Sequence, residues 1–419
     1  MKRKIIRRAA MVFLLATVLI GCAVSGGCRG EEPGHDRESD EKESVEPPSE
    51  GEDEPESAEK EKEKKGPELR EEEQRKQRIA GIISGMTLEE KVCQLFMVTP
   101  EQLTHVNTVI QAGEATKASL EKYPVGGIVY FKQNILDEEQ IKTMITNSRS
   151  YSKYPLFIGV DEEGGSLVAR IANNEGFSVE KVPDMQTIGA SQDIEEAYQA
   201  GQTIGTYLSD LGFDMDFAPV ADVLTNPNNT AIGKRSFGPD AKVDAQMVAQ
   251  VVKGLEERNV KAVLKHFPGH GGTDGDSHEE AVANERTLEQ LEETEFLPFI
   301  SGIQAGAKFV MVGHISLPSV TGDNTPATLS PAIIGGLLRE RLGFDGVVIT
   351  DSMSMGAITN YYTPAEAAVK VIQAGGDMVL MPANFEQAYE GVLEALRNGT
   401  LKEERIDESV YRILDCKIE

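Results

Sequence analysis

Basic residues are scarce in this sequence of 419 residues. Lysine and arginine together number 42, against 69 aspartates and glutamates, so the formal net charge is −27. Nucleic acids are polyanions, and proteins bind them through clusters of lysine and arginine. The acidic balance therefore argues against DNA or RNA as a partner, and we expect no nucleic-acid binding.

Cysteine is also scarce, with four residues, and no two of them have the C-x-x-C spacing of a metal site. Cys93 and Cys416 lie in apolar surroundings near the two ends of the globular part, where two free, buried thiols are expected; a disulfide between them is the alternative. The sequence lacks a P-loop and a strand–GxGxxG–helix pattern, so we predict no cofactor.

The first residues lack a convincing membrane span. Residues 1–8 carry five basic side chains, and the apolar run that follows, residues 9–20, is short, as in a secretory signal. Residues 19–22, Leu-Ile-Gly-Cys, resemble a lipobox, the site at which a bacterial lipoprotein is cleaved and lipidated. We therefore predict a signal peptide over residues 1–21 and a lipid on Cys22 that anchors the exported protein to the outer face of the cell membrane. An ordinary signal with a chance cysteine is the alternative.

The segment after Cys22 lacks aromatic residues almost completely. From about residue 29 to residue 78 it consists mainly of Glu, Lys, Asp, Pro, Ser and Gly. Such a composition cannot bury enough apolar surface to offset the entropy of ordering. We predict a disordered acidic linker over residues 22–78, with a helical lead-in from about residue 68. The remaining residues, 79–419, are enough for one large α/β domain.

Strands and helices are expected to alternate along residues 79–419. Eight apolar runs are bounded by turn signals and separated by segments with helical spacing. The runs are residues 92–98, 126–131, 155–161, 213–222, 260–267, 307–315, 346–353 and 376–382. This pattern predicts a parallel sheet covered on both faces, and eight such units favour a (β/α)8 TIM barrel in the α/β class. A doubly wound open sheet is the alternative.

Polar residues cluster at the carboxyl ends of five of these runs. They are Asp161, Asp222, Lys265 with His266, His314 and Asp351. Catalytic residues of barrels collect at this face, so the set favours the barrel and predicts an active site there. Asp222 taken alone is better explained as a cap of the next helix.

Residues 265–278, KHFPGHGGTDGDSH, hold three of the six histidines and four glycines. The Asp276 carboxylate can accept a hydrogen bond from His278, which leaves the other ring nitrogen for proton transfer. For this triplet alone, a helix cap is the better explanation, but the nearby charged residues favour a catalytic pair. The glycines are expected to let the loop close over a substrate.

Three charged residues on other loops complete the candidate site. Asp351 directly follows a buried strand and is suited to act as a nucleophile or an electrostatic stabiliser. Arg170 and Arg235 follow the third and fourth runs and are suited to bind hydroxyl-rich or carboxyl-bearing groups. Each arginine taken singly is equally well explained as a structural ion pair.

A metal site is not expected. His266 and His270 have the spacing of a helical pair of metal ligands, but Phe-Pro-Gly at residues 267–269 excludes a helix between them. The first predicted strand also lacks an H-x-H motif.

Three motifs together resemble glycoside hydrolase family 3, in its bacterial β-N-acetylglucosaminidase branch. They are KHFPGHG followed by DSH (residues 265–278), TLEQLEETEFLPF (287–299) and GFDGVVITDSMSMGAI (343–358). The similarity covers nearly all of residues 80–419. It implies a retaining exo-β-N-acetylglucosaminidase that removes terminal N-acetylglucosamine from peptidoglycan fragments or related glycans.

The resemblance also implies roles for single residues. Asp351 matches the nucleophile that forms a covalent glycosyl–enzyme, His278 matches the acid/base, and Asp276 matches its partner. The positions that match the substrate-binding residues of the family are Asp161, Arg170, Arg235, Lys265 and His266. A histidine, unlike a carboxylate, does not repel an incoming phosphate, so phosphorolysis beside hydrolysis is a further hypothesis.

The sequence departs from the family pattern in three places. Gly272 stands where the family commonly has aspartate, and Asp274 is the candidate replacement. The stretch DEEGGSLVAR is one residue longer before Arg170 than is usual. We expect no second domain, a site built within the barrel and its loops, and a monomer. A non-catalytic cell-wall-binding lipoprotein and a metal-dependent barrel hydrolase are the alternatives.

Overall fold

The computed structural model describes residues 67–275 and 280–418. The predicted signal peptide, Cys22 and most of the predicted linker lie outside the described residues, as do Asp276 and His278. All described residues belong to one compact unit, residues 64–419. None of the helices in the described part is long and apolar enough to cross a membrane.

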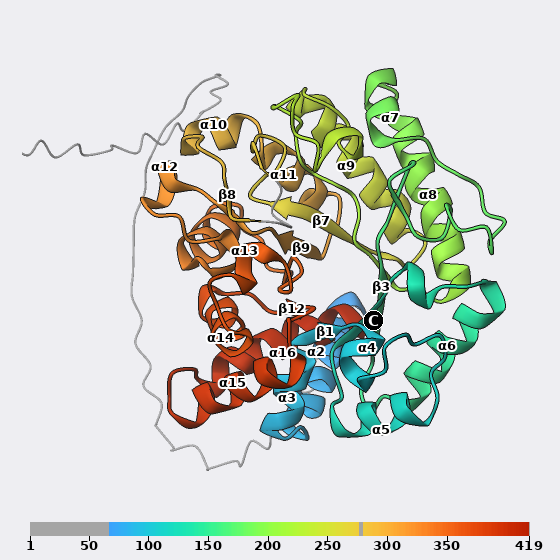
Figure 1. Cartoon of the computed structure of the whole chain (residues 1–419), viewed down its shortest axis with the longest axis vertical. Helices are drawn as coiled ribbons and strands as arrows, with labels where there is room; N and C mark the ends of the chain where they lie inside the picture. Colours follow the sequence, from blue (N-terminus) through green and yellow to red (C-terminus); the bar gives the residue numbers. More distant parts are fainter. Residues whose placement is uncertain (1–66, 276–279, 419) are drawn as a thin grey trace, which may run out of the picture. The chain divides into compact units, whose positions relative to one another are not determined.

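Eight parallel strands form a closed barrel at the centre of this unit (Figure 1). The strands are β1 Phe96–Val98, β2 Gly127–Tyr130, β3 Phe157–Val160, β6 Met215–Asp216, β7 Lys261–Phe267, β9 Phe309–Val312, β11 Val347–Thr350 and β12 Val379–Leu380. They pair in the order β11-β9-β7-β6-β3-β2-β1-β12. The Thr350 N–H donates to the Met378 carbonyl at 3.0 Å, which joins β11 to β12 and closes the ring. The predicted (β/α)8 barrel is confirmed, and the open sheet is excluded.

The strands are buried on both faces, as their near-continuous apolar sequences predict. Met97, Val129, Met215 and their neighbours fill the inside of the barrel. Across that interior, the rings of Phe157 and Phe309 meet edge to face with centroids 5.3 Å apart. The outward side chains pack against the surrounding helices in a second, larger core.

Helices surround the barrel in chain order (Figure 1). They are α3 Leu88–Gln94, α5 Glu114–Lys122, α6 Glu138–Tyr151, α8 Ile194–Leu211, α9 Ala241–Glu256, α10 Leu288–Glu293, α11 Phe296–Gln304, the π-helical segment η4 Ala332–Arg341, α14 Pro364–Ala374, α15 Phe385–Arg397 and α16 Glu403–Lys417. Side-chain caps fix several of their starts: Asp137, Asp240 and Thr363 each accept a hydrogen bond from a first-turn N–H.

The first predicted strand begins too early. Residues 92–94 belong to helix α3, because Thr87 and Glu90 form a capping box that starts a helix at Leu88. The strand β1 is therefore only Phe96–Val98. At the N-terminal end of the described part, helix α2 (Pro67–Ser84) runs through the predicted domain start at residue 79.

Helix α2 is tied to the far end of the chain. Arg75 on α2 pairs with Asp415 on α16 at 3.3 Å. Ile79 on α2 is fully buried in the core.

Cys93 and Cys416 are both free thiols, as predicted, although Cys416 is only half-buried.

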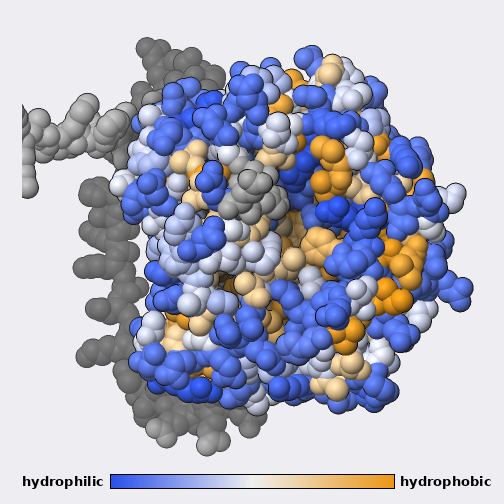
Figure 2. All heavy atoms as spheres, viewed as in Figure 1, coloured by the Kyte–Doolittle hydropathy of each residue, from blue (hydrophilic) through white to orange (hydrophobic). Residues whose placement is uncertain are grey.

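Short elements lie in the loops that leave the carboxyl ends of the strands. They are α4 Pro100–Thr104, η1 Lys132–Asn134, β4 Glu162–Gly164, β5 Val168–Ala169, α7 Met185–Ser191, η2 Gly233–Arg235, β8 Val282–Ala283, β10 Ile315–Ser316, α12 Pro318–Thr321, η3 Ala327–Leu329 and α13 Gly356–Thr359. Figure 2 shows a mostly hydrophilic rim in the same view, with separate apolar clusters on the right and mixed residues around the centre.

Candidate active site

A pocket of about 480 Å³ lies at the carboxyl ends of the barrel strands. Six of the predicted site residues line it together: Asp161, Arg170, Arg235, Lys265, His266 and Asp351. Apolar side chains, among them Phe131, Phe217 and Met311, complete its wall. The barrel thus brings these six residues from the ends of four strands, β3, β6, β7 and β11, into one cavity, at the face where barrel enzymes carry their active sites.

A chain of buried charges forms one side of the pocket. The Lys265 Nζ lies 2.8 Å from Asp161 Oδ1 and 2.5 Å from Glu163 Oε1. Arg235 donates to both oxygens of Glu163, at 2.8 and 2.7 Å. The Lys265 and Glu163 side chains are 3% and 2% exposed. Two cations and two anions alternate in this network, so their charges cancel locally.

The electrostatics of this network keep its members charged. Burial by itself raises the pKa of Glu163, but the charges of Arg235 and Lys265 outweigh it and hold that pKa well below its usual range. Burial lowers the pKa of Lys265 and of Arg235, yet the neighbouring carboxylates raise both above their ordinary values. The pocket therefore presents a fixed, preorganised set of donors and acceptors to a polar ligand.

Glu163 is a site residue that the sequence analysis missed. It follows Asp161 by two positions in the run Asp-Glu-Glu at the end of β3. Alternate side chains of an extended chain point to the same side, so this spacing was the available signal. Its partner Arg235 is 72 residues away in the sequence, and no local sequence pattern predicts that the two side chains form an ion pair.

Asp222 orients the His266 ring. The sequence analysis did not predict this role for Asp222. The fully buried Asp222 carboxylate lies 2.7 Å from His266 Nδ1 and accepts from the His270 backbone N–H at 2.6 Å. A carboxylate beside Nδ1 places the ring proton there and leaves Nε2 as the free acceptor. The interpretation of Asp222 as a helix cap is wrong, since Asp240 caps the following helix, α9.

Asp222 and His270, one buried acid and one buried base, have shifted pKa values. Burial by itself raises the pKa of Asp222, but its electrostatic interaction and hydrogen bond with His266 outweigh burial and lower that pKa below the usual value. Burial lowers the pKa of His270. His270 therefore favours the neutral form, and its Nδ1 lies 2.8 Å from the Thr273 hydroxyl.

Asp351 is held at the end of β11. Its backbone N–H donates to the Val312 carbonyl at 2.9 Å, and its Oδ1 accepts from the Ser352 N–H at 2.7 Å. His314 lies outside the pocket lining and instead contacts the Ser352 carbonyl through Nε2, at 2.9 Å. This histidine therefore fixes the loop after β11 rather than facing a ligand.

Arg170 reaches the pocket from a hairpin. Strands β4 and β5 pair antiparallel, with a shift of register between Glu162 and Gly164, and Arg170 directly follows β5. Its guanidinium carbon lies 5.9 Å from the centroid of the Phe131 ring, within the range of a cation–π contact. The extra residue before this arginine, noted in the sequence, does not keep it out of the pocket.

The loop after β7 is clamped up to Asp274. Asn229 donates to the His270 carbonyl at 2.8 Å, and Asn226 donates to Asp274 Oδ1 at 2.7 Å. Asp274 thus makes a local contact, with Asn226. Asp276 and His278 follow just beyond this anchor, outside the described residues.

The glycines in the described part of this loop permit close packing. A Cβ on Gly271 would lie 2.1 Å from the Val223 carbonyl oxygen, and one on Gly269, which has φ +119°, would lie 2.4 Å from Glu295. Close contacts with neighbouring groups therefore explain the glycines at 269 and 271. That the glycines let the loop close over a substrate stays a prediction. A Cβ on Gly272 would lie 3.0 Å from the Thr225 hydroxyl.

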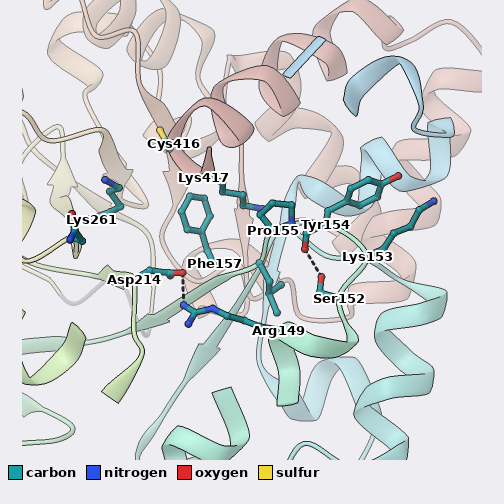
Figure 3. A pocket seen from close by; sticks show the side chains of 12 residues that line it. Arg149, Ser152, Lys153, Tyr154, Pro155, Phe157, Asp214, Lys261, Cys416 and Lys417 are labelled. Carbon is teal, nitrogen blue, oxygen red and sulfur yellow. Dashed lines mark hydrogen bonds and ion pairs between the residues drawn. The ribbon is translucent and has the colours of Figure 1, made fainter. Parts of the chain in front are cut away.

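A second pocket of about 410 Å³ lies at the opposite end of the barrel (Figure 3). Phe157 and Lys261, which line it, begin strands β3 and β7. Its cations are already partnered: Arg149 with Asp214 at 2.6 Å, and Lys417 with the face of Phe157 at 4.9 Å. Burial lowers the pKa of Lys417 to about 7. None of the predicted site residues in the described part of the chain lines this pocket.

Within residues 67–275 and 280–418, no group of three or more His, Cys, Asp or Glu side chains is arranged to hold a metal ion.

Residues 87–416 match the family model described as "Glycosyl hydrolase family 3 N terminal domain". The chain belongs to glycosyl hydrolase family 3. This confirms the family to which the motifs of residues 265–358 point.

The relatives agree with the family 3 assignment. "Beta-hexosaminidase A" of Pseudoalteromonas piscicida is 32% identical over 324 residues, which cover 71% of this chain and 54% of the relative. "Beta-hexosaminidase LpqI" of Mycobacterium tuberculosis is 32% identical over 348 residues, or 81% of this chain and 84% of that protein. The chain thus spans about half the length of the first relative and most of the second.

Solved structures have the same fold. A family 3 β-N-acetylglucosaminidase from Paenibacillus sp. superimposes with a TM-score of 0.74 at 37% identity, covering 79% of this chain and 62% of that one. The structure titled "M tuberculosis LpqI" gives a TM-score of 0.71 at 31% identity, covering 81% and 96%.

Proposed function

We propose that this protein is a retaining exo-β-N-acetylhexosaminidase that hydrolyses terminal N-acetylglucosamine residues. The observation that carries the proposal is the convergence of Asp351 with the network of Asp161, Glu163, Lys265 and Arg235 in one pocket. The β-hexosaminidase names of the relatives support the choice of sugar.

In the proposed mechanism, the Asp351 carboxylate attacks the anomeric carbon and forms a covalent glycosyl–enzyme. His278, oriented by Asp276, protonates the leaving oxygen and then removes a proton from the water that hydrolyses the intermediate. The clamped loop from His270 to Asp274 supports this assignment, because it anchors the chain just before the pair.

The charged network would bind the hydroxyl groups of the sugar. Lys265 and Arg235 donate, Asp161 accepts, and His266 offers Nε2 because Asp222 holds its other nitrogen. Arg170, over Phe131, would close the side of the pocket formed by the hairpin. Apolar contacts would come from Met311 and its neighbours.

We further propose peptidoglycan fragments or related glycans as the natural substrate, and a lipid on Cys22 as the anchor at the outer face of the membrane. The argument for the anchor is the Leu-Ile-Gly-Cys motif after a short apolar run. Mass spectrometry of the N-terminal peptide from cells tests it. A diacylglycerol-modified Cys22 is expected, and an unmodified or uncleaved peptide would exclude the anchor.

Turnover of aryl N-acetyl-β-glucosaminides tests the activity. Asp351→Ala should abolish turnover, and a 2-fluoro sugar should label Asp351, as mapped by mass spectrometry. His278→Ala should lose little activity with acidic phenols and much with poor leaving groups. Equal loss on every leaving group would remove His278 from the acid/base role.

Three controls separate the alternatives. No turnover by the wild-type protein would favour the non-catalytic cell-wall-binding lipoprotein. Loss of turnover on adding a chelator would favour a metal-dependent hydrolase. Formation of sugar 1-phosphate in phosphate buffer would identify phosphorolysis beside hydrolysis.

A further inference from the structure

A buried hydrogen-bond network lies directly behind the pocket, and its centre is Glu162. This side chain is fully buried, although glutamate is seldom found so without partners. Glu162 stands between Asp161 and Glu163, which both line the pocket. Because successive side chains of an extended chain point to opposite sides, Glu162 points away from the pocket.

The Glu162 carboxylate accepts three hydrogen bonds. Its Oε2 accepts from the Ile171 N–H at 2.7 Å, and its Oε1 accepts from the Ala172 N–H at 2.9 Å and from the Tyr207 hydroxyl at 2.8 Å. Ile171 and Ala172 directly follow Arg170, and Tyr207 lies on helix α8. The carboxylate therefore ties the backbone beyond Arg170 to the helix behind the barrel.

The position of this backbone decides where the Arg170 side chain lies. Among the described residues, the buried Arg170 Nε has no hydrogen-bond partner, and the guanidinium lies over the Phe131 ring. The two-stranded hairpin that carries Arg170 is short, and its register shifts between Glu162 and Gly164. Such a shift disrupts the ladder locally, so the hairpin alone holds Arg170 weakly.

We propose that Glu162 is a positioning residue: its carboxylate, together with the Tyr207 hydroxyl, sets the place of Arg170 in the substrate pocket. This inference rests on the proposed glycosidase function. Glu162 does not line the pocket, so it acts on a substrate only through the hairpin and Arg170.

A carboxylate is required at this position because all three neighbours donate. Glutamine has the same shape, but its amide group would point two hydrogens at the Ile171 N–H or at the Ala172 N–H. One buried backbone N–H would then lose its acceptor, and the backbone after Arg170 would have to move.

The test is a double-mutant cycle between Glu162 and Arg170. Glu162→Gln should lower kcat/KM for an aryl N-acetyl-β-glucosaminide by about tenfold, the effect of losing one buried hydrogen bond. In an Arg170→Ala background, the same substitution should change kcat/KM by less than about twofold, because the two residues act as a unit. Tyr207→Phe should show the same dependence on Arg170 with a smaller effect.

Tyr130→Phe is the matched control. It also removes a buried tyrosine hydroxyl, one that hydrogen-bonds Ser148 at 2.9 Å on the outer side of β2. It should lower the unfolding temperature about as much as Tyr207→Phe while leaving kcat/KM unchanged. Equal loss from Glu162→Gln with and without Arg170, or equal loss from both tyrosine variants, would overturn the inference.

Hydrogen exchange separates this inference from the proposed function. In Glu162→Gln, the amides of Ile171 and Ala172 should exchange faster than in the wild-type protein or in Tyr130→Phe, as measured by mass spectrometry of peptides over residues 168–174. If the wild-type protein turns over no substrate, the proposed function fails. The exchange measurement still shows whether Glu162 holds the backbone after Arg170. Unchanged exchange in that segment would exclude it.

Discussion

The substitution Glu163→Gln removes the charge of Glu163 but keeps its shape. In the native pocket, Glu163 balances Arg235 through two hydrogen bonds and Lys265 through one. After the substitution, two buried cations share the single carboxylate of Asp161, so the network changes from neutral to a net charge of +1. The glutamine amide also has a donor group that faces donors on Arg235 or Lys265.

The expected size of the effect follows from the burial of this network. Removing one partner of a buried ion pair costs about 3–5 kcal/mol, because the remaining charge stays desolvated. Each 1.4 kcal/mol corresponds to a factor of ten, so a loss of about 3 kcal/mol in the transition-state complex lowers kcat/KM roughly a hundredfold. Part of the loss will instead appear as a lower free energy of unfolding.

For the wild-type protein and for Glu163→Gln, we would measure kcat/KM with an aryl N-acetyl-β-glucosaminide and the unfolding temperature. Glu138→Gln is the control, because Glu138 makes an exposed ion pair with Lys142, at 2.6 Å, and such pairs contribute about 0.3–0.5 kcal/mol. A Glu163→Gln variant with kcat/KM within threefold of wild type and an unchanged unfolding temperature would refute the idea that Glu163 neutralises the pocket.

Three further predictions concern residues around the pocket. Asp222→Asn should lower kcat/KM by about tenfold or more, because His266 loses the carboxylate that fixes its tautomer. Folding lowers the pKa of Asp222, so the Asp222 carboxylate should stabilise the protein above the usual carboxylate range. In thermal unfolding scans, this stabilisation should disappear as the pH falls. Burial raises the pKa of Asp216 well above its usual value, so Asp216 contributes stability at acid pH that is lost as the pH rises. Asp216→Asn should flatten the pH dependence of the unfolding temperature above the usual titration range of an aspartate. Gly271→Ala should displace the loop after β7 and lower kcat/KM, since its Cβ would meet the Val223 carbonyl, whereas Gly335→Ala, with open space around its Cβ, should leave kcat/KM unchanged.

The fold and the membership of the site were largely predictable from sequence. Parallel strands buried on both faces leave near-continuous apolar runs, and each run ends where a polar residue appears. Asp161, Lys265, His266 and Asp351 were predicted from that rule, and all four line one pocket. The exception is the first strand, where the Thr87 capping box outweighs the apolar run.

The partners of these residues were not predictable, because each pairing joins distant parts of the chain. Glu163 meets Arg235 across 72 positions, and Asp222 meets His266 across 44. Burial of a carboxylate is decided by which cation or N–H the fold brings to it, and a single sequence does not record that. Asp222 looks like a helix cap in sequence for the same reason.

The run of Asp161, Glu162 and Glu163 shows how one short segment serves both sides of the barrel wall. The alternation of an extended chain sends Asp161 and Glu163 into the pocket, where two cations compensate them, and sends Glu162 outward to the backbone after Arg170. Three adjacent acidic residues would repel one another on one face. Here Lys265 lies between the Asp161 and Glu163 carboxylates, and Glu162 has separate donors on the other side. The segment therefore fixes the charge of the pocket from within and the position of its arginine from behind.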